Sequence, residues 1–174
     1  MKLAARLISL YFIIYILHPT VLGGNCTEEE LKRMGMLVKP DPDKETLFKT
    51  SKAMTMTGRK HGIRPGTSKE KLTRELTKLL RSIGIVEVSD KCLECFGASI
   101  QCVVKNCRGD CIKGPCTSGC QNCVKTKCKP KMLECIGTSD VPNPCEWEGE
   151  YLKYKLPETG EDESEKKGEA SGTS

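Results

Sequence analysis

The sequence predicts an all-α, disulfide-stapled protein built on a small helical hairpin. Twelve of the 174 residues are cysteines, and eleven of these lie between Cys92 and Cys145. Only 5% of the residues are aromatic, while 29% are charged, so few large side chains are available for a core. A module this dense in cysteine is held together by cross-links or by metal rather than by apolar burial alone.

The spacing of the cysteines predicts the hairpin. Two blocks of five cysteines, 92–111 and 116–135, are separated by the turn-forming sequence Ile-Lys-Gly-Pro. In each block three cysteines fall on one face of a helical wheel, so that they would line the seam between two helices. We expect Ser89-Asp90 to cap the first helix and Thr117-Ser118 the second, and Pro130 to kink or restart the second one.

A nested pairing is the simplest disulfide pattern for an antiparallel hairpin. It predicts Cys111–Cys116, Cys107–Cys120, Cys102–Cys123, Cys95–Cys128, Cys92–Cys135 and Cys26–Cys145. Measured from the turn, two of these pairs are out of register by about 3 and about 6 Å. Spacing alone does not establish connectivity, so this pairing is a hypothesis.

The first 23 residues have the three-part layout of a secretory signal peptide. Lys2 and Arg6 precede an apolar run from Leu7 to Leu17, and cleavage after Gly23 would leave a small residue at the cut. The run is too short to cross about 30 Å of hydrocarbon. No transmembrane segment is expected in the mature chain. We therefore expect a protein that is secreted, or held in the secretory lumen or at the cell surface through a partner.

The chain is expected to divide into five parts. These are a signal peptide (1–23), a short helix with a flexible linker (24–66), a basic amphipathic helix (67–84), a cysteine-rich disulfide domain (85–150) and an acidic disordered tail (151–174).

Capping boxes mark the two helices that precede the cysteine-rich domain. Thr27 with Glu30 opens a helix expected over 28–37, and Thr67 with Glu70 opens the amphipathic helix. The apolar residues of the second helix recur at helical spacing and end at Gly84, so we expect this helix to dock on the disulfide domain. A membrane-surface role for its basic face is the alternative.

Charge is unevenly distributed along the mature chain. The net charge is −2 over residues 25–48, +11 over 49–135 and −6 over 136–174. The basic middle is compatible with an anionic surface, a glycosaminoglycan or an acidic protein as partner, with folding back on the acidic tail, and equally with an ordinary solvated lysine-rich surface. Nucleic acid is not expected, because the same stretch holds only Phe96 for stacking on bases.

Whether the cysteines form disulfides or bind zinc depends on the compartment in which the protein folds. The spacing of Cys92 with Cys95, and of Cys120 with Cys123, is that of zinc ligands. An intracellular cysteine–zinc module that binds nucleic acid is therefore the alternative if the signal peptide is misassigned. In an oxidising lumen we expect disulfides and no metal. We also expect no cofactor and no catalytic residue, because His61 is the only histidine of the mature chain.

Short motifs supply further candidates. Asn25-Cys26-Thr27 fits the N-glycosylation pattern, which predicts a glycoprotein. Arg108-Gly109-Asp110 is the tripeptide that integrins bind on a constrained loop, so adhesion through it is an alternative function, although Gly109 would equally end the first helix. Gly58-Arg59-Lys60 is a candidate basic processing site.

The cysteine pattern also carries a resemblance. The stretch that begins Cys92-Leu93-Glu94-Cys95-Phe96-Gly97 and continues to Cys135 resembles small secreted cysteine-rich proteins of parasitic and free-living protists. The resemblance implies an extracellular or surface protein of antigen-like character and transfers no functional residues. Taken with the composition, it favours a secreted or surface-associated, non-catalytic binding protein.

Overall fold

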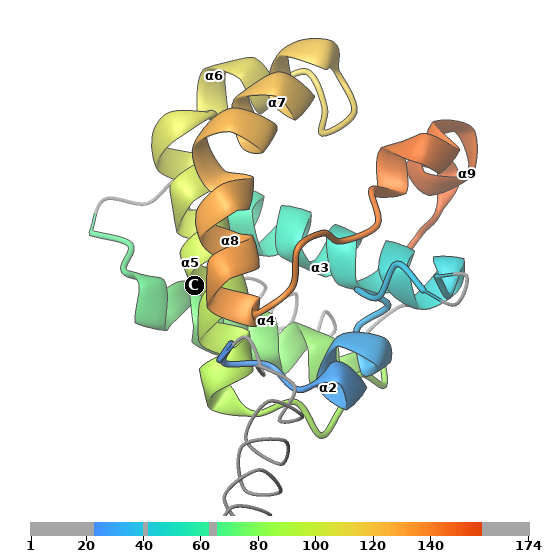
Figure 1. Cartoon of the computed structure of the whole chain (residues 1–174). Coiled ribbons are helices and arrows are strands. Elements are labelled where there is room, and N and C mark those ends of the chain that lie inside the picture. Colours follow the sequence, from blue (N-terminus) through green and yellow to red (C-terminus); the bar gives the residue numbers. More distant parts are fainter. Residues whose placement is uncertain (1–22, 40–41, 63–65, 158–174) are drawn as a thin grey trace, which may run out of the picture.

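The structure is a computed structural model of the chain and describes residues 23–39, 42–62 and 66–157. Every regular element in these ranges is helical, which confirms the predicted fold class. The central element is α5 (Asp90–Asn106), with α8 (Lys129–Ile136) beside it (Figure 1). The others are α2 (Glu28–Arg33), α3 (Lys44–His61), α4 (Lys69–Ser82), α6 (Arg108–Cys111), α7 (Ser118–Cys123), the π-helix η1 (Val124–Cys128), the 3-10 helix η2 (Pro144–Trp147) and α9 (Glu148–Lys153).

The predicted helical hairpin is present. After α5 the chain turns through α6, and α7, η1 and α8 then return beside it (Figure 1). The Ser89 hydroxyl accepts a hydrogen bond from the Cys92 N–H at 3.3 Å, and the Thr117 hydroxyl accepts one from the Cys120 N–H at 3.4 Å. These bonds satisfy first-turn donors that no helical carbonyl can reach. Both predicted caps are therefore confirmed.

The returning limb of the hairpin changes helical type before Pro130. In η1 the turn is wider than in an α-helix, and the Lys129 N–H donates to the carbonyl of Val124, five residues back. Pro130 has no N–H and lies in the first turn of α8, where no such donor is needed. The prediction that Pro130 restarts the second helix is confirmed.

The basic amphipathic helix, α4, docks on α5 as expected. Leu72 and Leu76 have no exposed surface, and Leu80 is 1% exposed. The two helices approach so closely that a β-carbon added to Gly97 of α5 would lie 2.0 Å from the Thr73 Oγ1 of α4. The apolar face of α4 is therefore used inside this protein.

The ends of α4 confirm one expectation and correct another. The cap is Ser68, whose hydroxyl accepts from the Lys71 N–H at 3.3 Å, so the predicted cap at Thr67 is wrong by one residue. The Thr67 hydroxyl instead donates to the carbonyl of His61 at 2.7 Å, which ties the end of α3 to the start of α4. After α4 the chain turns at Gly84 with φ +85°, as predicted.

The flexible linker expected between the first helix and residue 66 is wrong, because most of this stretch forms α3. The Asp43 carboxylate caps the helix by accepting from the Thr46 N–H at 3.2 Å. Its inward-facing residues, each at most 4% exposed, are Leu47, Phe48, Thr50, Ala53 and Thr57. Only two of these side chains are large and apolar, so the helical periodicity is weak in the sequence. Packing against the rest of the fold makes this segment a helix.

Residues 144–157 pack against the first half of α3. The ring centroid of Phe48 lies 5.4 Å from that of Tyr151 and 6.5 Å from that of Trp147. Lys44 forms an ion pair with Glu150 at 3.2 Å. Tyr151 is only 1% exposed. The acidic tail expected from residue 151 therefore does not begin there, and residues 158–174 lie outside the described part of the chain.

The capping box at the start of the chain is confirmed. The Glu30 carboxylate accepts from the Thr27 N–H at 2.7 Å, and the Thr27 hydroxyl accepts from the Glu30 N–H at 3.2 Å. The helix, α2, ends at Arg33 rather than at residue 37. The chain then turns at Gly35 with φ +65°, where a β-carbon would lie 2.4 Å from the backbone nitrogen of Leu47.

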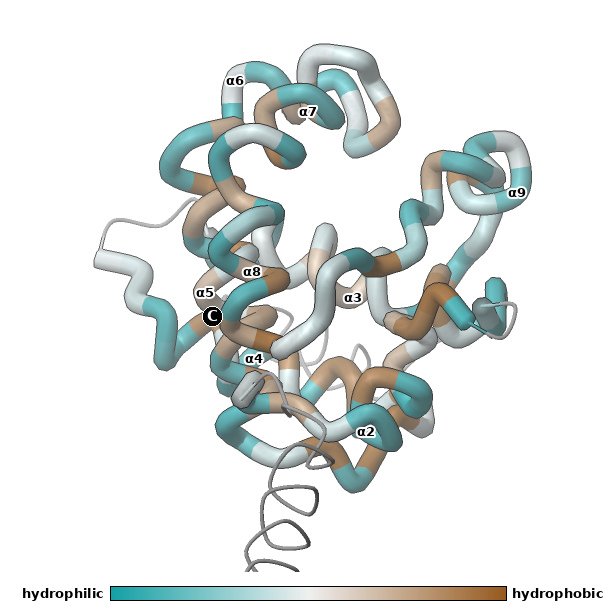
Figure 2. The backbone as a smooth tube through the Cα atoms, in the orientation of Figure 1, coloured by the Kyte–Doolittle hydropathy of each residue, from teal (hydrophilic) through white to brown (hydrophobic). Residues whose placement is uncertain are grey.

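The hydrophobic core lies where α2, α3, α4, α5 and the end of α8 meet. Its fully buried residues include Met34, Leu47, Leu72, Phe96 and Ile136. Figure 2 shows hydrophobic stretches of chain around α2 and α4. This core occupies one end of the hairpin and leaves the other end, around α6 and α7, to be held by disulfides.

Candidate ligand-binding cavity

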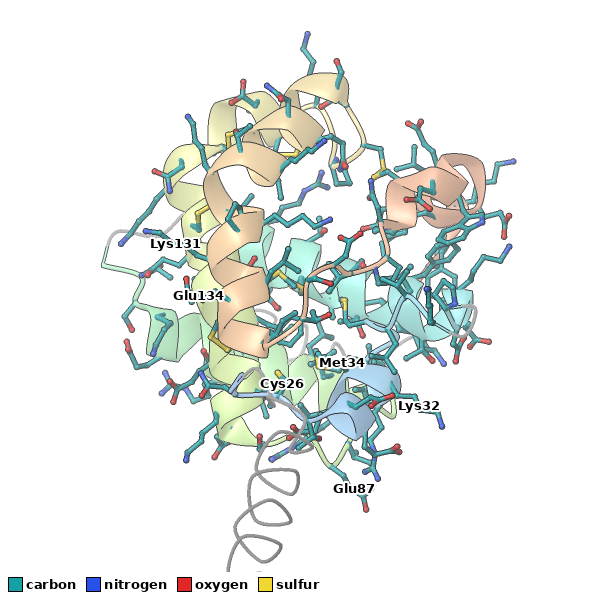
Figure 3. All side chains as sticks on the ribbon, viewed as in Figure 1. Cys26, Lys32, Met34, Glu87, Lys131 and Glu134 are labelled. Atoms are coloured by element: carbon teal, nitrogen blue, oxygen red, sulfur yellow. A yellow bond between two sulfur atoms is a disulfide. The ribbon has the colours of Figure 1, made fainter. Side chains whose placement is uncertain are left out.

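All twelve cysteines are paired with one another, as the sequence predicts (Figure 3). The six disulfides are Cys26–Cys92, Cys95–Cys135, Cys102–Cys128, Cys107–Cys123, Cys111–Cys120 and Cys116–Cys145. The predicted partners are wrong for every bond. The nested arrangement is nevertheless correct for the four bonds that cross the hairpin.

The register of the four nested bonds follows from matched intervals between cysteines. Counted away from the turn, Cys111, Cys107, Cys102 and Cys95 are separated by 4, 5 and 7 residues. Their partners after the turn, Cys120, Cys123, Cys128 and Cys135, are separated by 3, 5 and 7 residues. Matching intervals keep the partners level, with Cα–Cα distances from 4.5 to 5.7 Å. The wrong prediction took Cys116 as the innermost partner. The intervals were visible in the sequence and would have identified the pairing.

The remaining two disulfides each connect the hairpin to a segment outside it. Cys26–Cys92 fixes the N-terminal segment to the first turn of α5. Cys116–Cys145 fixes the hairpin turn to residues 137–147, which connect α8 to α9 and are called the strap below. The side chain of Gln121 adds to this link, because its Oε1 accepts from Asn143 Nδ2 at 2.9 Å and its Nε2 donates to the Pro115 carbonyl at 2.7 Å.

A cavity of about 710 Å³ lies between the hairpin, α3 and the strap. This volume is within the range of small-molecule binding sites. Its walls are mainly apolar, and each element contributes to them. Representative side chains are Met54 of α3, Ile100 and Val103 of α5, Val124 of η1, Met132 of α8 and Val141 of the strap.

Tyr151 places one polar group on the wall of this cavity. Burial raises the pKa of its phenol above the ordinary value, while a hydrogen bond to Thr55 and the positive charge of Arg59 act in the opposite direction. The Thr55 hydroxyl also donates to the carbonyl of Ser51 at 2.9 Å. The hydroxyls of Thr55 and Tyr151 therefore already have partners within the protein.

The ionisable side chains around the cavity are predominantly cationic. Arg59, Arg108, Lys125 and Lys129 line it, and none of its lining residues within the described ranges is aspartate or glutamate. Lys129 forms an ion pair with Asp140 at 2.6 Å. Among the described residues, no carboxylate lies within ion-pair distance of the other three cations.

The tripeptide Arg108-Gly109-Asp110 forms the short helix α6 at the hairpin turn. All three residues are exposed, and the disulfides of Cys107 and Cys111 flank them. Their backbone is helical rather than the constrained loop that the adhesion hypothesis assumes. Adhesion through this motif stays a prediction, whereas the position of Arg108 on the cavity is an observation.

Asn25 lies at the foot of the hairpin. Its Nδ2 is 3.6 Å from Cys95 Sγ and 3.5 Å from Cys135 Sγ, and its backbone N–H donates to the Cys135 carbonyl at 2.8 Å. The Thr27 hydroxyl of the glycosylation motif is part of the α2 capping box. Glycosylation of Asn25 stays a prediction, and the signal peptide expected over 1–23 falls almost wholly outside the described residues.

The zinc alternative would need cysteines that here form disulfides. Cys92 and Cys95 are bonded to Cys26 and Cys135, and Cys120 and Cys123 to Cys111 and Cys107. Within residues 23–39, 42–62 and 66–157, no three histidine, cysteine or acidic side chains form a group that would hold a metal ion. The candidate processing site at residues 58–60 lies in the last turns of α3.

Comparison of the chain with protein-family models, with curated proteins and with solved structures finds no match. In the described part of the chain, no helix is both long enough and apolar enough to cross a membrane. The fold and the site define the class of this protein as small, helical and disulfide-rich, with an apolar cavity beside the disulfide hairpin. Six disulfides fit an extracellular or secretory compartment.

Proposed function

We propose that this chain is a secreted, non-catalytic binding protein that holds an apolar ligand in the cavity between the hairpin, α3 and the strap. The observation that carries the proposal is a cavity of about 710 Å³ with mainly apolar walls. Exposing such a surface to water is unfavourable, so covering it with an apolar ligand would release free energy. A surface-antigen role, from the sequence resemblance, is compatible with this activity and is proposed with it.

The disulfides support the proposal because they hold the walls of the cavity apart before any ligand arrives. Cys111, Cys120 and Cys145 are themselves lining residues, and each is bonded to a cysteine of another segment or across the turn. A protein of this size has a small core and gains much of its stability from such cross-links. A preorganised site loses less conformational entropy when it binds.

The residue types around the cavity favour binding over catalysis. Its cysteines are oxidised, and its described lining contains neither a histidine nor a carboxylate that would act as a general base. The one titratable phenol, Tyr151, is buried and has its pKa raised by that burial. An apolar cavity needs none of these groups to bind its ligand.

Titration with a neutral, solvent-sensitive dye such as Nile red tests the proposal. The secreted chain with all disulfides formed should bind the dye saturably, with blue-shifted emission. Met54→Trp should abolish this binding because Met54 lines the cavity. Met56→Trp is the matched control, since Met56 is on the same helix but is 47% exposed and does not line the cavity. Absence of saturable binding, or equal binding by the two variants, would refute the proposal.

A further inference from the structure

The charges around the cavity indicate which apolar ligands it would prefer, if it binds a ligand as proposed above. Three cations on its lining, Arg59, Arg108 and Lys125, lack an ion-pair partner among the described residues. They come from three different elements, α3, α6 and η1. With no acidic side chain in the described lining to offset them, these cations create a positive potential over a mainly apolar interior.

This combination favours an amphiphile with one acidic end. An uncharged hydrocarbon would fill the apolar interior but leave the cations unused. A small polar anion would pair with the cations but leave the apolar walls uncovered. A ligand with an alkyl chain and an anionic head satisfies both parts of the site, because charge-assisted hydrogen bonds to arginine and lysine are stronger than neutral ones.

The electrostatic environment of Tyr151 reflects the positive charge of Arg59 on the cavity lining. The charge of Arg59 stabilises the ionised form of this buried phenol and so acts to lower its pKa, although burial dominates. A positive field therefore already reaches the cavity wall formed by Tyr151. A carboxylate placed within the same field would be stabilised in the same way.

We propose that the cavity binds a long-chain fatty acid, with the alkyl chain along Met54, Ile100 and Val103 and the carboxylate held by Arg59, Arg108 and Lys125. Charge complementarity selects this occupant over a neutral lipid. The strap, held by Cys116–Cys145, forms the wall on the α9 side. Removing the cations should reduce the preference for an acid while leaving the apolar interior intact.

Displacement of the bound neutral dye by matched ligands tests this proposal. Dodecanoic acid and dodecanol, each below its aggregation concentration, have the same chain and differ in the charge of the head. The acid should bind at least about tenfold more tightly. Lengthening the acid by one methylene should tighten binding about fourfold until the cavity is full.

Charge-neutralising variants identify the groups that hold the head. Arg59→Gln, Arg108→Gln and Lys125→Gln together should bring the affinity for the acid close to that for the alcohol. Lys131→Gln is the control for net charge, because Lys131 is exposed on α8 and does not line the cavity (Figure 3). A preference for the acid that survives the triple substitution would overturn the proposal.

The other possible results of the displacement experiment distinguish failure of the fatty-acid proposal from failure of the cavity proposal. If the dye binds but acid and alcohol compete equally, the cavity binds apolar ligands as proposed above and the fatty-acid inference fails. If neither competes and the dye does not bind, both proposals fail. If acid binds only after residues 158–174 are removed, this segment, with six acidic and two basic residues, is the occupant and the lipid proposal is overturned.

Discussion

The carboxylate of Glu30 accepts a hydrogen bond from the backbone N–H of Ser89, 59 residues further along the chain, at 2.7 Å. Its other oxygen accepts from the Thr27 N–H at 2.7 Å. Thr27 caps α2 and Ser89 caps α5, so one carboxylate connects the first turns of both helices. Burial opposes ionisation of this group, but the hydrogen bonds from Ser89 and Thr27 outweigh it and lower its pKa to about 2.

This contact predicts an acid-sensitive component of stability. Because the pKa of Glu30 is lower in the folded chain than the ordinary value of 4.5, the stabilisation is complete above pH 4.5 and is lost as the pH falls toward 2. Glu30→Gln should lower the free energy of unfolding at pH 7 by about 1–3 kcal/mol and flatten its pH dependence in that window. Urea unfolding at several pH values measures both effects.

Glu29→Gln is the control for this experiment. The Glu29 side chain is 61% exposed and has one ion pair, with Arg33 at 3.4 Å. Such an exposed pair contributes less than about 1 kcal/mol. An equal loss of stability in both variants would show that the contact with Ser89 is not what stabilises the fold.

The close approach of α4 and α5 predicts that Gly97 does not tolerate a side chain. The β-carbon of Gly97→Ala would lie 2.0 Å from the Oγ1 and 3.0 Å from the Cβ of Thr73, so the helices would have to separate. We expect a loss of about 1–3 kcal/mol in the free energy of unfolding. Gly149→Ala, in α9, is the matched control because no atom lies within 4 Å of its β-carbon, and stability should not decrease. Comparable losses in the two variants would contradict this packing.

The disulfide pairing can be tested directly by mass spectrometry. Trypsin leaves Cys92, Cys95 and Cys102 on one peptide, so partial reduction with stepwise alkylation before digestion is needed, and it should identify Cys92 as the partner of Cys26. Partial reduction should then show Cys145 bonded to Cys116. Recovery of a Cys26–Cys145 linkage instead would support the pairing from simple nesting and contradict the structure.

The strap provides a test of the cavity wall. Removing its disulfide with Cys116→Ser and Cys145→Ser should speed hydrogen exchange in residues 141–151 and weaken dye binding, because the wall is released at one end. Cys26→Ser with Cys92→Ser removes a disulfide whose cysteines do not line the cavity. Dye binding should survive that second change. Unaltered binding after release of the strap would show that the strap is not part of the site.

Much of the local structure could be predicted because its determinants lie within a few residues of each other. The caps at Thr27, Ser89 and Thr117, the restart at Pro130 and the turn at Gly84 all depend on a side chain or ring acting on the adjacent backbone. Such contacts form in the same way wherever the helix lies in the fold. The density of cysteine likewise predicted the disulfides themselves.

The cavity could be predicted only in part. The sequence marks Arg108 through its tripeptide, which does not indicate a cation on a cavity wall. It marks Arg59 only as part of a candidate processing site. Both residues reach the same cavity because α3 and the hairpin turn come together, although the two side chains are 49 positions apart in the chain. No pattern within either segment contains that information.

By itself, the sequence determined an all-helical chain cross-linked through cysteine, with the starts of α2, α5 and α7 and the docked amphipathic helix. Only the tertiary structure decided that residues 44–61 form a helix, because Thr50 and Thr57 are buried there by neighbouring segments and their sequence has little apolar periodicity. Tertiary structure also decided that Cys116 pairs with the strap rather than across the turn. Both depend on contacts between distant segments, whose free energy exceeds the local preferences that a single stretch of sequence expresses.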